Sequence, residues 1–141
     1  MSHADLARRF YEDVMNRGDL AAIDELLTAD FVDHEEGPPG TPEGIEGVKF
    51  FVTTFREAFP DLQVTIEDTI ESGDRLAIRA TMRGTHDGEL MGVPPSGRRV
   101  ELGMIDIVRV EGDRVAEHWG ATDNLSLMQQ IGAIPEEAAA S

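Results

Sequence analysis

Residues 62–82, LQVTIEDTIESGDRLAIRATM, decide the fold class of this 141-residue chain. Apolar side chains occupy alternate positions on both sides of the letters SGD at 72–74. These positions are Leu62, Val64, Ile66, Leu76, Ile78, Ala80 and Met82. Side chains alternate between the two faces of a β-strand, so a period of two predicts strands with one buried face. The segment therefore predicts an antiparallel β-hairpin.

The same alternation returns nearer the C-terminus, in residues 100–121, VELGMIDIVRVEGDRVAEHWGA. The letters EGD at 111–113 form the expected turn, and the turn-rich GVPPSGRR at 92–99 separates this segment from the first hairpin. We therefore predict a second hairpin, followed by a helix that begins after Asp123.

Helical patterns precede the strands. Apolar residues at every fourth position predict a helix over about 3–16, and a second short helix begins after Asp19. A short strand is expected at 30–34, and a third helix over 41–59, which Pro60 ends. Helices followed by a β-meander indicate an α+β fold, in which one antiparallel sheet lies against the helices and can curve around an apolar cavity.

Length and composition limit the classes of protein. The length predicts a single domain over 1–141, with about 134–141 as a frayed tail. The absence of Cys and the lack of metal-ligand spacing among four His predict no metal site. A net charge of −16 disfavours nucleic acid and anionic membranes as partners. Without a long apolar run or a signal-peptide pattern, we expect a cytoplasmic protein.

Three segments carry a resemblance to a known family: FVDH at 31–34, GTHDGELMGVPPSGRRV at 84–100, and VRVEGDRVAEHWGATDNLSLMQQIG at 108–132. With the order of elements, they make the chain similar to the SnoaL-like polyketide cyclases of the nuclear transport factor 2-like superfamily. The resemblance implies a cone-shaped α+β barrel, with N-terminal helices packed on a curved, mainly antiparallel sheet around a deep apolar pocket. It also implies a homodimer or higher oligomer and acid–base chemistry without a cofactor.

The chain departs from that family at the expected catalytic aspartate. The resemblance places this aspartate two residues after His118, where the chain has Gly120. It also places Asp106 where the antibiotic-pathway cyclases have a pocket histidine. An aldol cyclase therefore does not follow directly from the resemblance.

Strand parity places Met104 and Asp106 on one face, and His118 and Gly120 together on a face of the next strand. An aspartate among apolar residues either finds a donor such as His118 or has its pKa raised by burial. We therefore predict Asp106 as the principal proton acceptor and His118 as its neighbour. The alternative is a satisfied polar pair without catalytic function, or one that faces solvent.

His34 closes the short strand, near where the resemblance places the proton-shuttling aspartate of related ketosteroid isomerases. We predict His34 as the opposing acid or second base across the pocket, with Asp33 beside it. The alternative is a strand-end histidine bonded to a loop carbonyl. His86 is expected to be an exposed loop residue.

Further residues are expected to be structural or to line the substrate site. Trp119 should pack against a helix, and Asp123 should cap the last helix. Some rings of the phenylalanine cluster on the third helix are expected to form the pocket wall. The predicted substrate-binding residues are Asp33, Phe55, Met104, Trp119 and Asp123.

Three classes of function follow. The first is a cofactor-independent acid–base enzyme, a cyclase or isomerase, that acts on a small apolar or polyketide-like carbonyl substrate. The second is a hydrolase similar to limonene-epoxide hydrolase. Such a site needs an Arg between two acids, and this class is weakened because Arg109 and Asp106 lie on opposite strand faces. The third is a non-catalytic protein that binds a lipophilic ligand or serves as a dimerisation scaffold.

Overall fold

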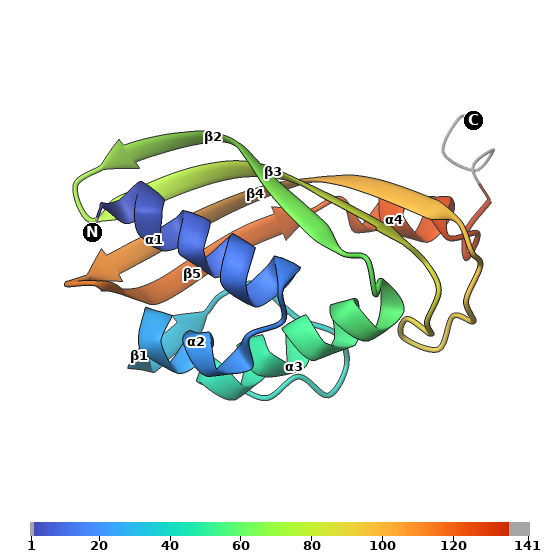
Figure 1. Ribbon diagram of the computed structural model, residues 1–141, viewed down its shortest axis with the longest axis horizontal. Helices are drawn as coiled ribbons and strands as arrows, with labels where there is room; N and C mark the ends of the chain where they lie inside the picture. Colours follow the sequence, from blue (N-terminus) through green and yellow to red (C-terminus); the bar gives the residue numbers. More distant parts are fainter. Residues whose placement is uncertain (1, 136–141) are drawn as a thin grey trace.

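Five strands form one mixed sheet in the computed structural model, which describes residues 2–135. The strands are β1 (Leu27–Asp33), β2 (Gln63–Ser72), β3 (Arg75–Thr85), β4 (Arg99–Glu111) and β5 (Arg114–Thr122). Their order across the sheet is β1-β5-β4-β3-β2, with β1 parallel to β5 and the other neighbours antiparallel. Figure 1 shows both predicted hairpins, and the predicted α+β class is confirmed.

The helices are α1 (His3–Arg9), η1 (Phe10–Asn16), α2 (Leu20–Leu26), α3 (Gly44–Ala58) and α4 (Asn124–Gln130). The predicted helix over 3–16 is present, and its second half, η1, is π-helical. The capping predictions hold: Asp19 accepts from the Ala22 amide and Asp123 from the Ser126 amide. The third helix begins at Gly44, three residues later than predicted, because Glu43 is still in an extended conformation.

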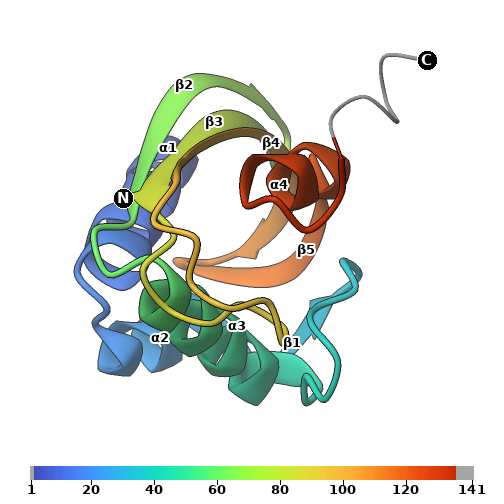
Figure 2. The same ribbon diagram turned by 90° about the vertical axis from the view of Figure 1, so that its right-hand side faces the viewer.

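The sheet curves around the helices without closing. In Figure 2 it wraps from β2 over β3 and β4 to β5 and β1, while α1, α2 and α3 cover its concave face. The two edge strands do not pair with each other, and at the β2 edge the Asn16 side chain bonds both backbone groups of Val64. The predicted barrel is therefore an open cone.

Strand alternation builds the core between the sheet and the helices. Residues of the inner sheet face are buried against helical side chains, as the period of two predicts. From the sheet these are Leu76, Ile78, Ala80, Met82, Val100, Leu102 and Met104, and from the helices Val14, Ile23, Leu26, Val52 and Phe55. The outer face keeps apolar residues too, since Ile105 and Ile107 on β4 and Ile70 on β2 are exposed.

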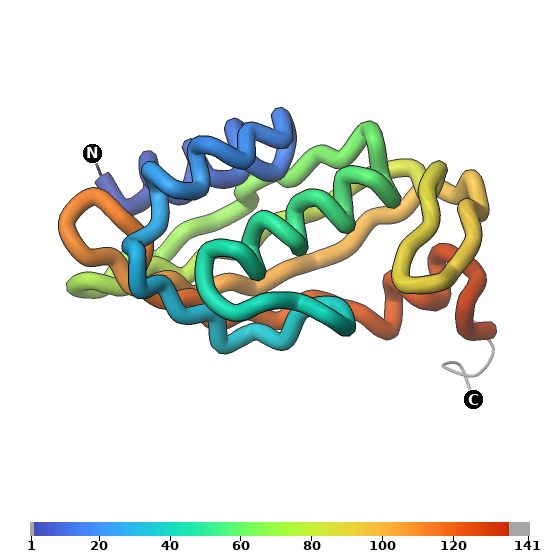
Figure 3. The backbone as a smooth tube through the Cα atoms, turned by 90° about the horizontal axis from the view of Figure 1, so that it is seen from below, coloured from blue at the N-terminus to red at the C-terminus, as the bar shows by residue number. Residues whose placement is uncertain are grey.

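The prediction for His86, in the loop between β3 and β4, is wrong. His86 is completely buried instead of exposed: its Nδ1 lies 3.1 Å from the Ser96 amide, which donates to it, and its ring lies against Phe59. The cause is that the loop folds back over the end of α3, where the Ala58 carbonyl accepts from the Gly88 amide. Figure 3 shows this loop (yellow) at the same end of the molecule as α4.

None of the helices within residues 2–135 is long and apolar enough to cross a membrane.

Candidate active site

Three adjacent strands bring the central side chains together. His118 of β5 is the partner of Asp33 on the parallel strand β1, and its Nδ1 lies 2.8 Å from Asp33 Oδ1. On its other side, His118 Nε2 lies 2.8 Å from Oδ1 of Asp106, which comes from β4. The expected contact between Asp106 and His118 is therefore present, and both side chains lie on the inner face of the sheet.

Tyr11 adds a fourth group that sequence reasoning missed. Its hydroxyl donates to Asp106 Oδ2 at 2.5 Å, and its ring is buried between η1 and the sheet. Tyr11 follows Phe10 on an apolar helix, so its ring is easily interpreted as core packing. The only available signal was that a buried tyrosine hydroxyl needs a partner.

Glu35 is the second residue that was missed. It lies in the loop after β1, where its amide donates to Asp33 Oδ1 at 2.9 Å. Its carboxylate turns back toward β5: Oε2 accepts from Thr122 Oγ1 at 3.3 Å, and Oε1 lies 3.9 Å from His118 Nε2. One glutamate among 28 acidic residues carries no distinguishing local pattern.

Gly120 leaves the space in which these groups meet. A Cβ atom at this position would lie 2.5 Å from Glu35 Oε1, 2.7 Å from Asp106 Oδ1 and 2.9 Å from His118 Cε1. Any side chain here would therefore displace at least one of the three groups. The position of the expected aspartate is filled instead by the glutamate carboxylate that arrives from the loop after β1.

The carboxylates keep His118 positively charged. Burial by itself lowers the pKa of His118, but hydrogen bonds to Asp106 and Asp33 overcome this effect and raise the pKa to about 10. A neutral imidazole has only one N–H, so two carboxylate contacts require the doubly protonated ring. Burial, with the charge of Asp106, raises the pKa of Tyr11 well above its ordinary value, so this hydroxyl stays a neutral donor.

The same site is the candidate for metal binding in the described part of the chain. Glu35, Asp106 and His118 each offer a ligand atom, and these atoms lie within 4.8 Å of one another. Both ring nitrogens of His118 lie 2.8 Å from a carboxylate oxygen, so a metal ion at this site would have to replace the contact between Nε2 and Asp106.

His34 does not converge on this cluster, contrary to prediction. Its side chain lies on the outer face, where Nε2 is 2.8 Å from Glu117 Oε2 and the ring stacks on Trp119 with centroids 4.8 Å apart. The reason is strand alternation: His34 follows Asp33 directly, so the two side chains lie on opposite faces. His34 therefore cannot act across an inner pocket from Asp106 in this arrangement.

The remaining predicted residues divide between the core, the surface and the outer face. Trp119 does not pack against a helix: it is half-buried on the outer face, between His34 and the Arg75 guanidinium, which lies 4.9 Å from its ring centroid. Phe55 and Met104 are buried in the core, while Asp123 is an exposed cap. Of these residues, Met104 shares the inner face of β4 with Asp106.

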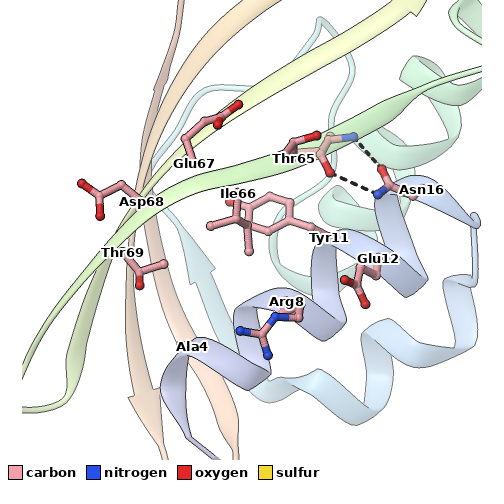
Figure 4. A pocket seen from close by; sticks show the side chains of 11 residues that line it. Ala4, Arg8, Tyr11, Glu12, Asn16, Thr65, Ile66, Glu67, Asp68 and Thr69 are labelled. Carbon is pink, nitrogen blue, oxygen red and sulfur yellow. Dashed lines mark hydrogen bonds between the residues drawn. The ribbon is translucent and has the colours of Figure 1, made fainter.

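The largest hollow among those described differs from the predicted deep apolar pocket. It has a volume of about 510 Å³ and lies between the first helical segment and the edge strand β2 (Figure 4). Polar and charged side chains predominate in its lining: Ala4, Arg8, Tyr11, Glu12, Asn16, Val64, Thr65, Ile66, Glu67, Asp68 and Thr69. Only Tyr11 of the site cluster contributes to it.

Comparison with known proteins identifies the family of this chain. The profile of the family described as SnoaL-like polyketide cyclase matches residues 5–131. The chain belongs to this family. Within it, the chain is 29% identical over 136 residues to aklanonic acid methyl ester cyclase DauD from Streptomyces sp. (strain C5), an alignment that spans 91% of this chain and 80% of DauD.

Solved structures of similar proteins have the same fold. TsrD from Streptomyces laurentii is 31% identical with a TM-score of 0.84, and the match covers 95% of this chain and 99% of TsrD. IdmH from Streptomyces antibioticus is 38% identical with a TM-score of 0.78. That match covers 92% of this chain and 97% of IdmH. Membership of the family supports a cyclase or isomerase function for this chain.

Proposed function

We propose that this chain is a cofactor-independent acid–base enzyme that cyclises or isomerises a small apolar or polyketide-like carbonyl compound. The observation that carries the proposal is the position of His118, largely buried between the carboxylates of Asp33 and Asp106 and close to that of Glu35. A cation and a proton acceptor side by side are the two groups that enolate chemistry requires.

The reaction begins at a carbon next to a carbonyl group. A carboxylate of the cluster removes a proton from this carbon, and the negative charge moves to the carbonyl oxygen. The positive charge of His118 stabilises the enolate, because a fixed charge in a partly desolvated site acts more strongly than in water. Asp106 and Asp33 hold the ring on two sides, and Tyr11 holds Asp106.

The family supports this class of substrate. DauD, by its name, is a cyclase of aklanonic acid methyl ester, and we extend that chemistry to this chain as an ester or ketone substrate with an acidic carbon. The epoxide-hydrolase alternative has less support. Arg109 binds Glu117 and Glu111 on the outer face and therefore does not lie between two acids at the site.

A substrate assay tests the proposal. Purified protein is incubated in D2O with aklanonic acid methyl ester, hydrophobic β-keto esters, enones and 1-tetralone, and mass spectrometry records cyclised or isomerised product and deuterium uptake. His118→Gln should reduce the rate about 10²-fold, the scale of positioned acid–base catalysis. His34→Gln is the matched control, since this histidine lies on the opposite face of the sheet.

Absence of any product or exchange with the whole carbonyl panel would contradict the enzyme proposal. Equal rates for His118→Gln and the wild type would contradict the assigned site. If an apolar ligand binds without being transformed, the protein is better described as a lipophilic-ligand-binding protein.

We also propose that two copies of the chain associate through the outer face of the sheet. Strand register places Ile70, Ala77, Ile107 and Trp119 in one row across β2, β3, β4 and β5, and Ile105 is exposed in the next row. Ile70 and Ile107 of this row are exposed and Ala77 and Trp119 are half-buried, and an apolar patch of this kind on a sheet is typical of a protein interface. Burial of this row in a symmetric dimer would remove it from water.

A further inference from the structure

We propose that Glu35, and not Asp106, is the catalytic residue that accepts the substrate proton. This inference rests on the proposed function and assigns one step of it to one side chain. It departs from the expectation based on strand parity, which favoured Asp106.

Asp106 is already occupied by other donors. Its Oδ2 accepts from the Tyr11 hydroxyl and its Oδ1 from the His118 imidazolium, and its side chain is only 9% exposed. Both carboxylate oxygens of Asp106 are therefore engaged by donors inside the protein, and little of the side chain is open to a substrate. Asp33 differs from Asp106, because its Oδ1 accepts from both His118 and the Glu35 amide while its Oδ2 accepts no hydrogen bond within residues 2–135.

Glu35 has a carboxylate oxygen that accepts no hydrogen bond from the described residues and lies near Nε2 of His118. Its Oε2 accepts one hydrogen bond, from Thr122, and at 3.3 Å this bond is long. Within residues 2–135, Oε1 accepts no hydrogen bond and lies 3.9 Å from His118 Nε2. The side chain is 25% exposed, so a substrate can reach Glu35 more easily than Asp106.

The surroundings also favour proton uptake by Glu35. Burial raises the pKa of its carboxyl group, against a smaller lowering effect of the His118 charge. Gly120 lets Oε1 approach the backbone of β5 beside Asp106 and His118, because a Cβ atom there would lie 2.5 Å from Oε1. The free oxygen therefore lies close to the cation that would face the developing enolate.

The step is balanced without a co-reactant. The bond between hydrogen and the carbon next to the carbonyl breaks, a bond forms between this hydrogen and Glu35 Oε1, and the electron pair moves into the enolate. In cyclisation the enolate carbon attacks a second carbonyl carbon, and Glu35 returns the proton to the resulting alkoxide. In isomerisation Glu35 returns the proton to another carbon of the substrate.

Chemical rescue distinguishes a base from a positioning residue. Glu35→Ala and Glu35→Gln are assayed by deuterium uptake into 1-tetralone, or into whichever compound of the carbonyl panel the wild type exchanges. Both variants should lose about 10²-fold in rate, and added acetate should restore Glu35→Ala by about tenfold or more, since acetate can replace a missing general base. The matched control is Glu36→Gln, a neighbouring exposed glutamate, which should keep the wild-type rate.

Each result decides between the alternatives. Asp106→Ala should also lose activity but should not be rescued by acetate. Rescue of Asp106→Ala in place of Glu35→Ala would overturn the assignment, as would a wild-type rate in Glu35→Gln. Lack of rescue in a folded Glu35→Ala protein also counts against it, because the gap at a partly exposed position is open to acetate. A wild type that processes no carbonyl compound removes the proposed function itself, which is a different outcome.

Discussion

The two faces of β5 hold contrasting arrangements one residue apart. On the inner face, His118 is largely buried and donates to Asp33 and Asp106. On the outer face, Trp119 is half-buried between the ring of His34 and the guanidinium of Arg75. Each arrangement takes one residue from the end of β1 and one from β5.

The difference shows how strand alternation separates the candidate active site from the proposed interface. Asp33 and His34 are consecutive, as are His118 and Trp119, and each pair divides between the two faces. The inner face gathers His118 and three carboxylates in a partly buried site. On the outer face, salt bridges such as that between Arg109 and Glu117 lie beside exposed apolar side chains.

Loss of the Asp106 carboxylate should have the largest effect on activity. Asp106→Asn presents an amide to two donors, Tyr11 and His118, so one of the two bonds must be lost. Turnover should fall about 10²-fold or more, while the fold is kept. The rate and the melting temperature are compared with those of Asp113→Asn in the exposed β4–β5 turn. Deuterium exchange at the wild-type rate in Asp106→Asn would exclude Asp106 from the mechanism.

A second effect concerns the pH dependence of stability. The pKa of His118 is raised in the folded state to about 10, above its ordinary value of 6.5. Its stabilising contribution is therefore complete below about pH 6.5 and is lost as the pH rises through about 10. The free energy of unfolding, measured by urea titration, should exceed that of His118→Gln at pH 6 by more than at pH 10.5. A difference that does not change with pH would show that His118 is not held in its charged form.

The third prediction concerns the proposed dimer interface on the outer face of the sheet. Ile107→Lys places a charge in the exposed apolar row, and the apparent mass should fall from about twice 15.4 kDa to the monomer value. Light scattering at micromolar concentration measures this change. Leu125→Lys, at an exposed apolar residue of α4, is the control and should leave the mass unchanged. A wild type that is already monomeric would contradict the proposed dimer.

The smallest effect is expected at Trp119. Burial against a helix would predict a loss of about 3 to 5 kcal/mol for Trp119→Ala. On the outer face we expect about 1 kcal/mol, from the stacking with His34 and the cation–π contact with Arg75. Urea unfolding of dilute protein checks the value, with Phe59→Ala in the core as the large-effect comparison. Equal losses in the two variants would mean that Trp119 belongs to the core.

Much of the fold could be predicted because its signals are local. The alternation in 62–82 and 100–121 gave both hairpins, and Asp19 and Asp123 cap the helices as expected. The short strand at 30–34 was placed too late, since β1 begins at Leu27. The apolar residue at the start of β1, Leu27, also fits the helical pattern of α2, which ends at Leu26. The local pattern therefore does not show where the helix ends and the strand begins.

The candidate site was predictable only in part. The pairing of Asp106 with His118 follows from parity on neighbouring strands. The face that His34 occupies does not follow from parity. Alternation shows which side chains share a face of the sheet, but it does not show which of the two faces the helices cover. Burial of His86 likewise depends on where a long loop folds back, which its own composition does not indicate.

The sequence by itself determined the α+β class, the hairpins, the caps and the family, because these depend on periodicity and on residues close together in the chain. Only the tertiary structure decided that Tyr11 contacts Asp106, 95 residues away, and that the loop after β1 brings Glu35 over Gly120. Such contacts form when curvature of the sheet brings distant segments together. The proposed role of Glu35 therefore depends on where the folded chain places its carboxylate relative to His118.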